Sequence, residues 1–307
     1  MRHPLRSKIA LLLPLVPPGL LAACGDDSPA ASQESRPPAS SAPPATSAPG
    51  GDTTEQPDGA YQVPTGADDV VISVVHEGGF VPVEMIFANT PVAMVTGDNR
   101  VLTTGPVPAI YPGPLLPNLL QRTITPEAVQ QLMAKADELG LLAEVEYPRN
   151  DQIADAPDTV VTINVNGATY EHRAYALGLD PEGGEDDPAR ANLLEFVNAM
   201  TDLATTVGED QLGPEEAYDA ETYLIRATPA DPEAAAEEGI EPTVVEWPAV
   251  APVRLADADE CAEVPVEEFE PLFRDANQLT FFTDAGPDGE PTPYRVVVVP
   301  QFPGRTC

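Results

Sequence analysis

The chain has 307 residues, of which 50 are Asp or Glu and 15 are Lys or Arg, giving a formal net charge of −35. Nucleic acids and anionic lipid surfaces are bound mainly through Lys and Arg, so the folded part of such a chain is expected to bind neither. Excess negative charge on this scale chiefly provides solubility and repulsion between copies.

Residues 1–23 have the pattern of an export signal. They contain basic residues, no acid and a short apolar run, Ile9 to Val16. This run is too short to cross about 30 Å of hydrocarbon, which indicates a secretory signal peptide. Its end, Leu21 to Gly25, resembles the bacterial lipobox, in which small residues precede a Cys that receives the lipid. We expect cleavage before Cys24 and lipidation of Cys24, with an ordinary signal peptide as the alternative.

Residues 24–60 are predicted to form a disordered tether after the lipidated Cys24. The segment consists largely of Pro, Ser, Ala, Thr, Gly and acids, so it has too little apolar surface to offset the entropy of ordering. Its prolines favour an extended chain at about 3.1 Å per residue, with a reach on the order of 100 Å. Such a tether would hold the rest of the chain away from the membrane. A flexible N-terminus with no spacing role is the alternative.

Residues 61–307 are predicted to form an α+β globular body, with antiparallel sheets of hairpins and two or three packed helices. This length suits one large domain or two smaller units, 61–210 and 211–307.

The first half of the body shows strand signals and one clear helix start. Short β-branched runs with Gly, Asp and Asn between them predict strands at 70–75, 83–86, 92–95 and 101–102. A proline-rich loop follows at 106–117. Thr125-Pro126-Glu127 then provides a capping hydroxyl, a first-turn Pro and an acid at the positive end of the helix dipole. This helix is expected to end at Gly140.

The remainder alternates hairpins and helices. Asn166-Gly167 predicts a hairpin between 159–165 and 169–176, and Asp187-Pro188 begins a helix that ends near Gly208. Further predicted elements are strands at 223–225 and 244–245, a helix at 266–276 bent or interrupted at Pro271, and a hairpin of 279–283 with 295–299. A helix followed by a hairpin thus occurs twice, at 125–176 and 265–299. This order suggests two related units, with chance likeness as the alternative.

Two cysteines, Cys261 and Cys307, remain if the lipid occupies Cys24. In an exported protein they are expected to form a disulfide, and two buried thiols are the alternative. In the chain-entropy model, a disulfide between residues as far apart in the sequence as Cys261 and Cys307 adds about 4 kcal/mol to the free energy of unfolding.

Residues typical of catalysis are sparse. Ser73 is the single serine of 61–307 and has no G-x-S-x-G around it, so a plain strand residue is expected. Lys135 is the single lysine beyond the signal, and neither a P-loop nor a dinucleotide-binding glycine motif is present. His76 and His172 lack the spacing of a zinc site. Each is expected to be structural, with metal binding or general-base catalysis as the alternative.

No cofactor is expected other than calcium. Asp284, Asp288 and Glu290 place three carboxylates in a predicted hairpin loop, and residues 182–187 form a second acidic cluster. Neither has the spacing of an EF-hand, so solvated turns are the expected interpretation and a calcium site the alternative.

Several segments resemble a family of uncharacterised lipoproteins of high-GC Gram-positive (actinobacterial) bacteria. They are residues 78–84, 111–114 with Gln121-Arg122, the helix start at Thr125-Pro126, and the ending from Tyr294 through 302–304 to Cys307. The resemblance implies an exported α+β protein with a terminal disulfide. It carries over no activity and no site residues.

We predict a membrane-anchored, extracytoplasmic lipoprotein that serves as a non-catalytic binding or interaction module of the cell envelope. Its partners would be the membrane, through the lipid, and an envelope protein or a small-molecule ligand. One alternative is an Asp/Glu-dependent extracytoplasmic hydrolase, with paired carboxylates about 5–9.5 Å apart in a cleft. The other is a solute-binding receptor, for which the loop Ile110 to Gly113 would be a rim; packing of that loop against the body is the simpler expectation.

Overall fold

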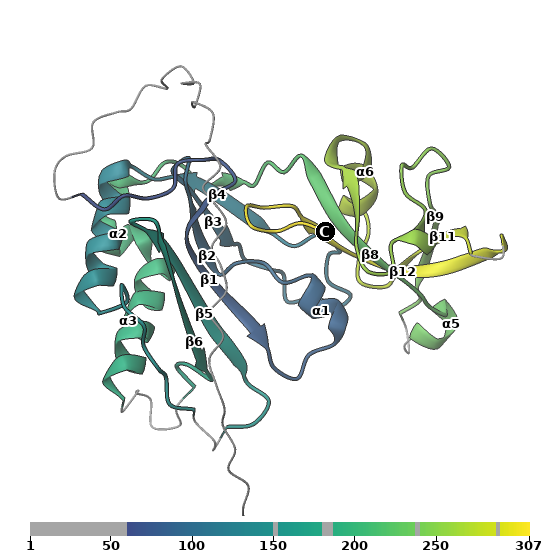
Figure 1. Cartoon of the computed structure of the whole chain (residues 1–307). Coiled ribbons are helices and arrows are strands. Elements are labelled where there is room, and N and C mark those ends of the chain that lie inside the picture. The colour runs from purple at the N-terminus through teal and green to yellow at the C-terminus, as the bar shows by residue number, and fades with distance from the viewer. Residues whose placement is uncertain (1–59, 150–152, 180–186, 237–239, 287–288) are drawn as a thin grey trace, which may run out of the picture. The chain divides into compact units, whose positions relative to one another are not determined.

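The computed structural model describes residues 60–149, 153–179, 187–236, 240–286 and 289–307, which belong to one compact unit, Gln56–Cys307. The expected signal peptide, Cys24 and the tether lie outside the described residues. The fold is α+β with two sheets, as predicted (Figure 1). None of the described helices has the length and apolar character needed to cross a membrane.

Sheet 1 has seven antiparallel strands in the order β6-β5-β1-β2-β3-β4-β7. The strands are β1 Val70–Gly78, β2 Ala93–Thr96, β3 Arg100–Thr104, β4 Leu119–Thr123, β5 Pro157–Val165, β6 Ala168–Tyr175 and β7 Glu216–Ala217. The predicted hairpin turns are present, with Asn99 and Asn166 in the left-handed conformation that such turns require.

Helices α2 (Pro126–Glu138) and α3 (Pro188–Thr201) pack on one face of sheet 1 (Figure 1). The caps predicted from the sequence are formed, because Thr125 Oγ1 accepts from the Ala128 N–H at 3.2 Å and Asp187 Oδ1 accepts from the Ala189 N–H at 3.0 Å. The buried core beneath them includes Ile72, Val74, Leu132, Met133, Val161, Ile163, Leu193, Phe196 and Met200. A short helix, α4 (Leu203–Val207), continues α3 as far as Gly208.

Sheet 2 has five strands in the order β10-β8-β12-β11-β9, of which only β9 and β11 run parallel. The strands are β8 Thr222–Pro229, β9 Thr243–Glu246, β10 Ala262–Pro265, β11 Thr280–Ala285 and β12 Pro291–Pro300. Helix α6 (Val266–Arg274) buries Phe269 and Phe273 against Trp247, with ring centroids 5.0 and 6.1 Å away. The short elements α5 (Pro232–Ala235), η1 (Glu209–Gln211) and η2 (Leu255–Asp257) complete the assignment.

The strand predicted at 83–86 is wrong. These residues lie in helix α1 (Val83–Phe87), which begins after Pro82, has no buried residue and exposes most of its apolar side chains. Helix α6 runs through Pro271 without a break, so of the two expected outcomes there the interruption is absent. Phe269 and Phe273 are buried on either side of Pro271. Strands β4, β7 and β10 were not predicted.

The helix-then-hairpin order is present twice, as α2 with β5 and β6, and as α6 with β11 and β12. The strand that pairs with the hairpin differs in position between the two. Strand β1 pairs with the first hairpin strand, β5, whereas β8 pairs with the second, β12.

The C-terminal segment, Gln301 to Cys307, contacts both sheets. Phe302 shares a buried cluster with Met94 and Leu102 of sheet 1 and with Leu224 and Val299 of sheet 2. The cysteine pairing is as predicted, because Cys307 is bonded to Cys261, which precedes β10, with the two Cα atoms 5.4 Å apart and 46 positions apart in sequence.

Replacing Cys307 by Ser is expected to lower the free energy of unfolding by about 2–4 kcal/mol, because the unfolded chain regains the freedom that the bridge removes. Denaturant unfolding of oxidised protein measures this. As a control, reductant should destabilise the unchanged protein equally and leave Cys307→Ser unaffected. Equal stability of the oxidised and reduced forms would contradict the prediction.

Candidate functional site

Of the two histidines considered as site residues, His172 is buried in structural contacts, whereas His76 is exposed on its strand. His172, on β6, is 1% exposed. Its Nε2 lies 2.8 Å from the Leu141 carbonyl oxygen, which can only accept, so Nε2 carries the proton and Nδ1 accepts from the Tyr147 hydroxyl at 2.8 Å. Burial lowers the pKa of His172. His76, on β1, has its Nδ1 3.2 Å from the Thr159 hydroxyl, and desolvation of its ring lowers its pKa as well.

Ser73 is a half-buried strand residue, as expected. It alternates with the core residues Ile72 and Val74 and so lies on the face of β1 away from the helices. There it lines a hollow of about 320 Å³ together with Phe302 to Arg305 and with Thr162, the residue opposite it on β5. The described residues around this hollow include no histidine, the usual base for a serine nucleophile.

The proposed calcium residues are only partly described. The Asp284 carboxylate accepts from the Leu255 N–H at 2.8 Å and from the Ala285 N–H at 2.7 Å, so both its oxygens stabilise the local backbone. Glu290 is exposed at the start of β12, and Asp288 lies outside the described residues. Within the described ranges, no group of three or more His, Cys, Asp or Glu side chains is placed to hold a metal ion.

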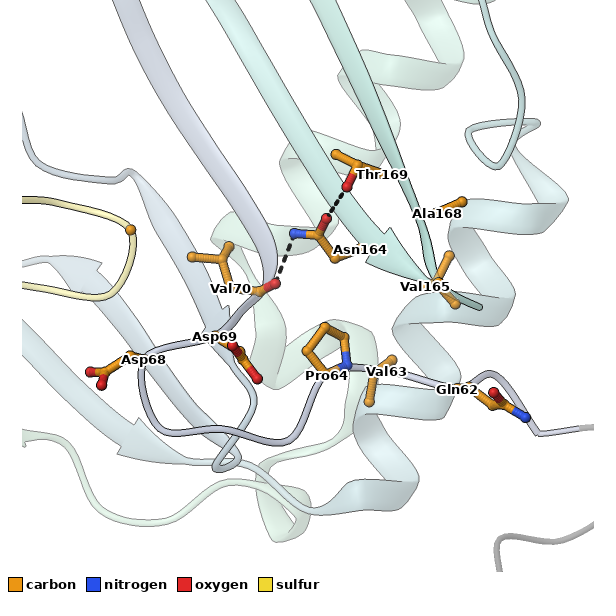
Figure 2. A pocket seen from close by; sticks show the side chains of 12 residues that line it. Gln62, Val63, Pro64, Asp68, Asp69, Val70, Asn164, Val165, Ala168 and Thr169 are labelled. Atoms are coloured by element: carbon orange, nitrogen blue, oxygen red, sulfur yellow. Dashed lines mark hydrogen bonds between the residues drawn. The ribbon is translucent and has the colours of Figure 1, made fainter. Parts of the chain in front are cut away.

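A wider pocket, of about 600 Å³, lies between the segment Gln62 to Val70 and the end of the β5–β6 hairpin (Figure 2). Asn164 joins its two sides, because its Nδ2 donates to the Val70 carbonyl oxygen at 2.8 Å and its Oδ1 accepts from the Thr169 hydroxyl at 2.6 Å. The Asp69 carboxylate accepts from the Gly66 N–H at 2.8 Å. These polar side chains therefore fasten the N-terminal segment to sheet 1.

Exposed apolar side chains are concentrated on two segments that connect strands of sheet 1, one between β1 and β2 and the other between β3 and β4. Of the eleven large apolar residues that are exposed in the described part of the chain, eight lie here, and we call them the loop surface: Phe80, Val81, Val83, Met85, Ile86, Val107, Ile110 and Tyr111. Phe80 is 88% exposed. Five of the eight lie between Phe80 and Ile86, and exposed apolar residues grouped in this way commonly mark interaction sites.

The loop surface is poor in charge, although the chain is strongly acidic. No Asp or Glu occurs between Asp98 and Glu127, and Glu84 is the single acid between Glu77 and Asp98. The concentration of apolar side chains therefore coincides with a scarcity of acidic ones, of which Glu84 is the single example within the two segments.

Both segments leave sheet 1 at the same end, and hydrogen bonds fix the backbone where they do so. The Thr90 and Thr104 hydroxyls lie 2.9 Å apart, and Thr104 Oγ1 donates to the Pro91 carbonyl oxygen at 3.0 Å. The Arg305 guanidinium donates to the carbonyl oxygens of Asn89, at 3.2 Å, and Phe87.

The proline-rich loop is also fixed to the segment between α6 and β11. The Gln278 N–H donates to the Gly113 carbonyl oxygen at 3.0 Å, and the Leu115 N–H donates to the Ala276 carbonyl oxygen at 3.2 Å. The loop therefore packs against the body at Gly113, as expected, whereas Ile110 and Tyr111 stay 66% and 52% exposed.

The chain enters sheet 1 at the end opposite the loop surface. The Gln62 N–H donates to Asn166 Oδ1 at 2.9 Å, in the turn beyond β5, and β1 then runs from Val70 toward α1. A strand of this length spans about 30 Å. The loop surface and the attachment point of the N-terminal segment thus lie at opposite ends of β1 (Figure 1).

Comparison of the chain with protein-family models, with curated proteins and with solved structures finds no match. The predicted loop Ile110 to Gly113 is part of the loop surface, whereas α1 was not predicted. The acid-free stretch from Asn99 to Pro126 is a signal for the proline-rich segment alone, because α1 lies outside it.

The burial of neutral His172 predicts a pH-dependent stability. The unfolded chain binds a proton at the ordinary His pKa of 6.5, whereas the folded protein binds it only at lower pH, so acid favours unfolding. The difference in free energy of unfolding between the unchanged protein and His172→Gln should be constant above pH 6.5. Below pH 6.5 the unchanged protein should lose stability relative to His172→Gln. Denaturant titrations across this range measure it, and His76 cancels in the comparison. A difference that does not vary with pH would contradict the prediction.

Proposed function

We propose that this chain is a lipid-anchored, extracytoplasmic interaction module of the cell envelope, which binds a protein partner through the loop surface without catalysis. The proposal includes the signal peptide, the lipid on Cys24, the tether at 24–60 and membership of the lipoprotein group that the sequence resembles.

One observation carries the proposal: eight large apolar side chains are exposed on two fixed, charge-poor segments of an otherwise acidic chain. Exposing these side chains to water is unfavourable by about 25 cal/mol for each Å² of apolar surface that a partner would bury. Because the backbone behind them is hydrogen-bonded, little conformational entropy would be lost when a partner binds.

The pattern of anchor and surface supports a role in holding or recruiting another envelope component. An extended tether would place the body on the order of 100 Å from the lipid and allow it to search a large volume. Two or more acyl chains would make the attachment stable.

Binding through the loop surface predicts that its apolar side chains are needed for a protein contact. A photoreactive residue at Ile110 should form a discrete crosslinked product in the producing cells, and the double change Phe80→Ser with Ile86→Ser should abolish it. Val250→Ser is the matched control, because Val250 is 87% exposed on another part of the body. Stability should be unchanged in every variant, since all three side chains are exposed. A product that survives the double change would argue against this function.

Lipid anchoring predicts that Cys24→Ala moves the chain out of the membrane fraction. Mass spectrometry of the N-terminal peptide of the unchanged chain should show an acylated Cys24. Cleavage at the same place with an unmodified Cys24 would instead indicate an ordinary signal peptide.

A further inference from the structure

We propose that the partner of the loop surface is an envelope protein whose apolar contact is bordered by Lys and Arg. This inference rests on the proposed function, because it concerns the same surface. It adds the chemistry of the partner.

Carboxylates lie within and beside the loop surface. Glu84 lies on α1 between Val83 and Met85. Asp155 lies beside Phe80, whose N–H donates to the Asp155 carbonyl oxygen at 3.3 Å. Exposed Asp275 precedes Ala276, whose carbonyl oxygen accepts from Leu115 at the end of the proline-rich loop. The first segment therefore has one acid among its apolar residues and one beside it, and a third acid lies next to the residue that holds the second segment.

These carboxylates are not neutralised by an ion pair within the described chain. Neighbouring Glu77 and Asp158 both pair with Arg173, at 2.8 and 3.4 Å. Glu84, Asp155 and Asp275 form no comparable ion pair with any described residue. Their charge is therefore available to a partner, and a basic border would complement it.

A second copy of this chain is a poor occupant of the loop surface. Two copies facing each other would bring the same carboxylates together, and like charges across an interface oppose association. The large negative charge of each chain adds to this repulsion. The loop surface is thus better suited to a different protein than to itself.

The membrane is a poor occupant of the loop surface, because an anionic lipid surface repels the same carboxylates. A protein partner with a basic border does not meet this repulsion.

The size of the surface agrees with a protein partner. Residues 79–89 and 105–113 together amount to about 20 residues, near the lower end of the 20–30 that each side of a standard protein interface contributes. A small-molecule ligand would need a concave site, whereas the side chains here project from a helix and a loop.

The experiment uses the full mature chain with a photoreactive residue at Ile86 or at Ile110. The crosslinked protein is identified by mass spectrometry, and its association rate with the chain is then measured at increasing NaCl concentration. The variant is Glu84→Lys with Asp155→Lys. The matched control is Glu138→Lys, an exposed acid at the end of α2 next to Asp137, which contacts Tyr61 on the tether side.

We expect one protein to be crosslinked from both positions, with Lys or Arg flanking the crosslinked peptide. The double charge reversal should slow association by roughly tenfold and remove most of its salt dependence, while Glu138→Lys should do neither. Flotation with vesicles of phosphatidylcholine, with and without phosphatidylglycerol, should leave the delipidated chain unbound.

Each other outcome overturns the inference in a distinguishable way. If the partner binds equally well after charge reversal, the basic border is wrong and the proposed function stands. Crosslinking to a second copy, or flotation with the vesicles, would replace the partner by the chain itself or by lipid. If no discrete product forms from either position, the inference and the proposed function fail together.

Discussion

The contacts of the segment Gln301 to Cys307 hold the remainder of the structure in place. Phe302 fills the buried cluster between the sheets, Arg305 binds the backbone after α1, and Cys307 is bonded to Cys261. Tyr218 adds a hydrogen bond from its hydroxyl to the Gln301 carbonyl oxygen at 3.0 Å. Because hydrophobic packing, charge-assisted hydrogen bonds and a covalent bridge act within one short segment, loosening any of them affects the others.

This segment also determines how the loop surface is presented. Helix α1 has no fully buried residue, and Phe87 at its end is the residue that packs against the cluster around Phe302. Arg305 supplies a further anchor, with its guanidinium 5.4 Å from the centre of the Phe87 ring and hydrogen-bonded to the carbonyl oxygens of Phe87 and Asn89. A short helix that would be marginal in water is thereby held in one place with its apolar side chains outward.

Local signals in the sequence predicted the elements that depend on local physics. Thr125 and Asp187 cap the helices that they were expected to start, and Asn166-Gly167 makes the expected hairpin turn. The error at Val83 to Ile86 arose because an apolar run predicts burial, whereas tertiary structure leaves this run exposed. Strand β4 was missed because Leu119 to Thr123 becomes a strand through pairing with β3, which its own residues do not signal. The site was harder still, since exposure of an apolar side chain is a property of the whole fold.

The charge distribution connects the fold with the proposed function. A chain with 50 acidic residues is kept soluble by repulsion, so it can expose apolar side chains that would cause aggregation in a neutral protein. The same repulsion opposes any interface with another acidic surface. Residues 99–126 contain no acid, so the second segment of the loop surface adds nothing to this repulsion. In the proposed function, acidity therefore opposes association over most of the body, while the apolar loop surface and the carboxylates beside it favour a partner with a basic border.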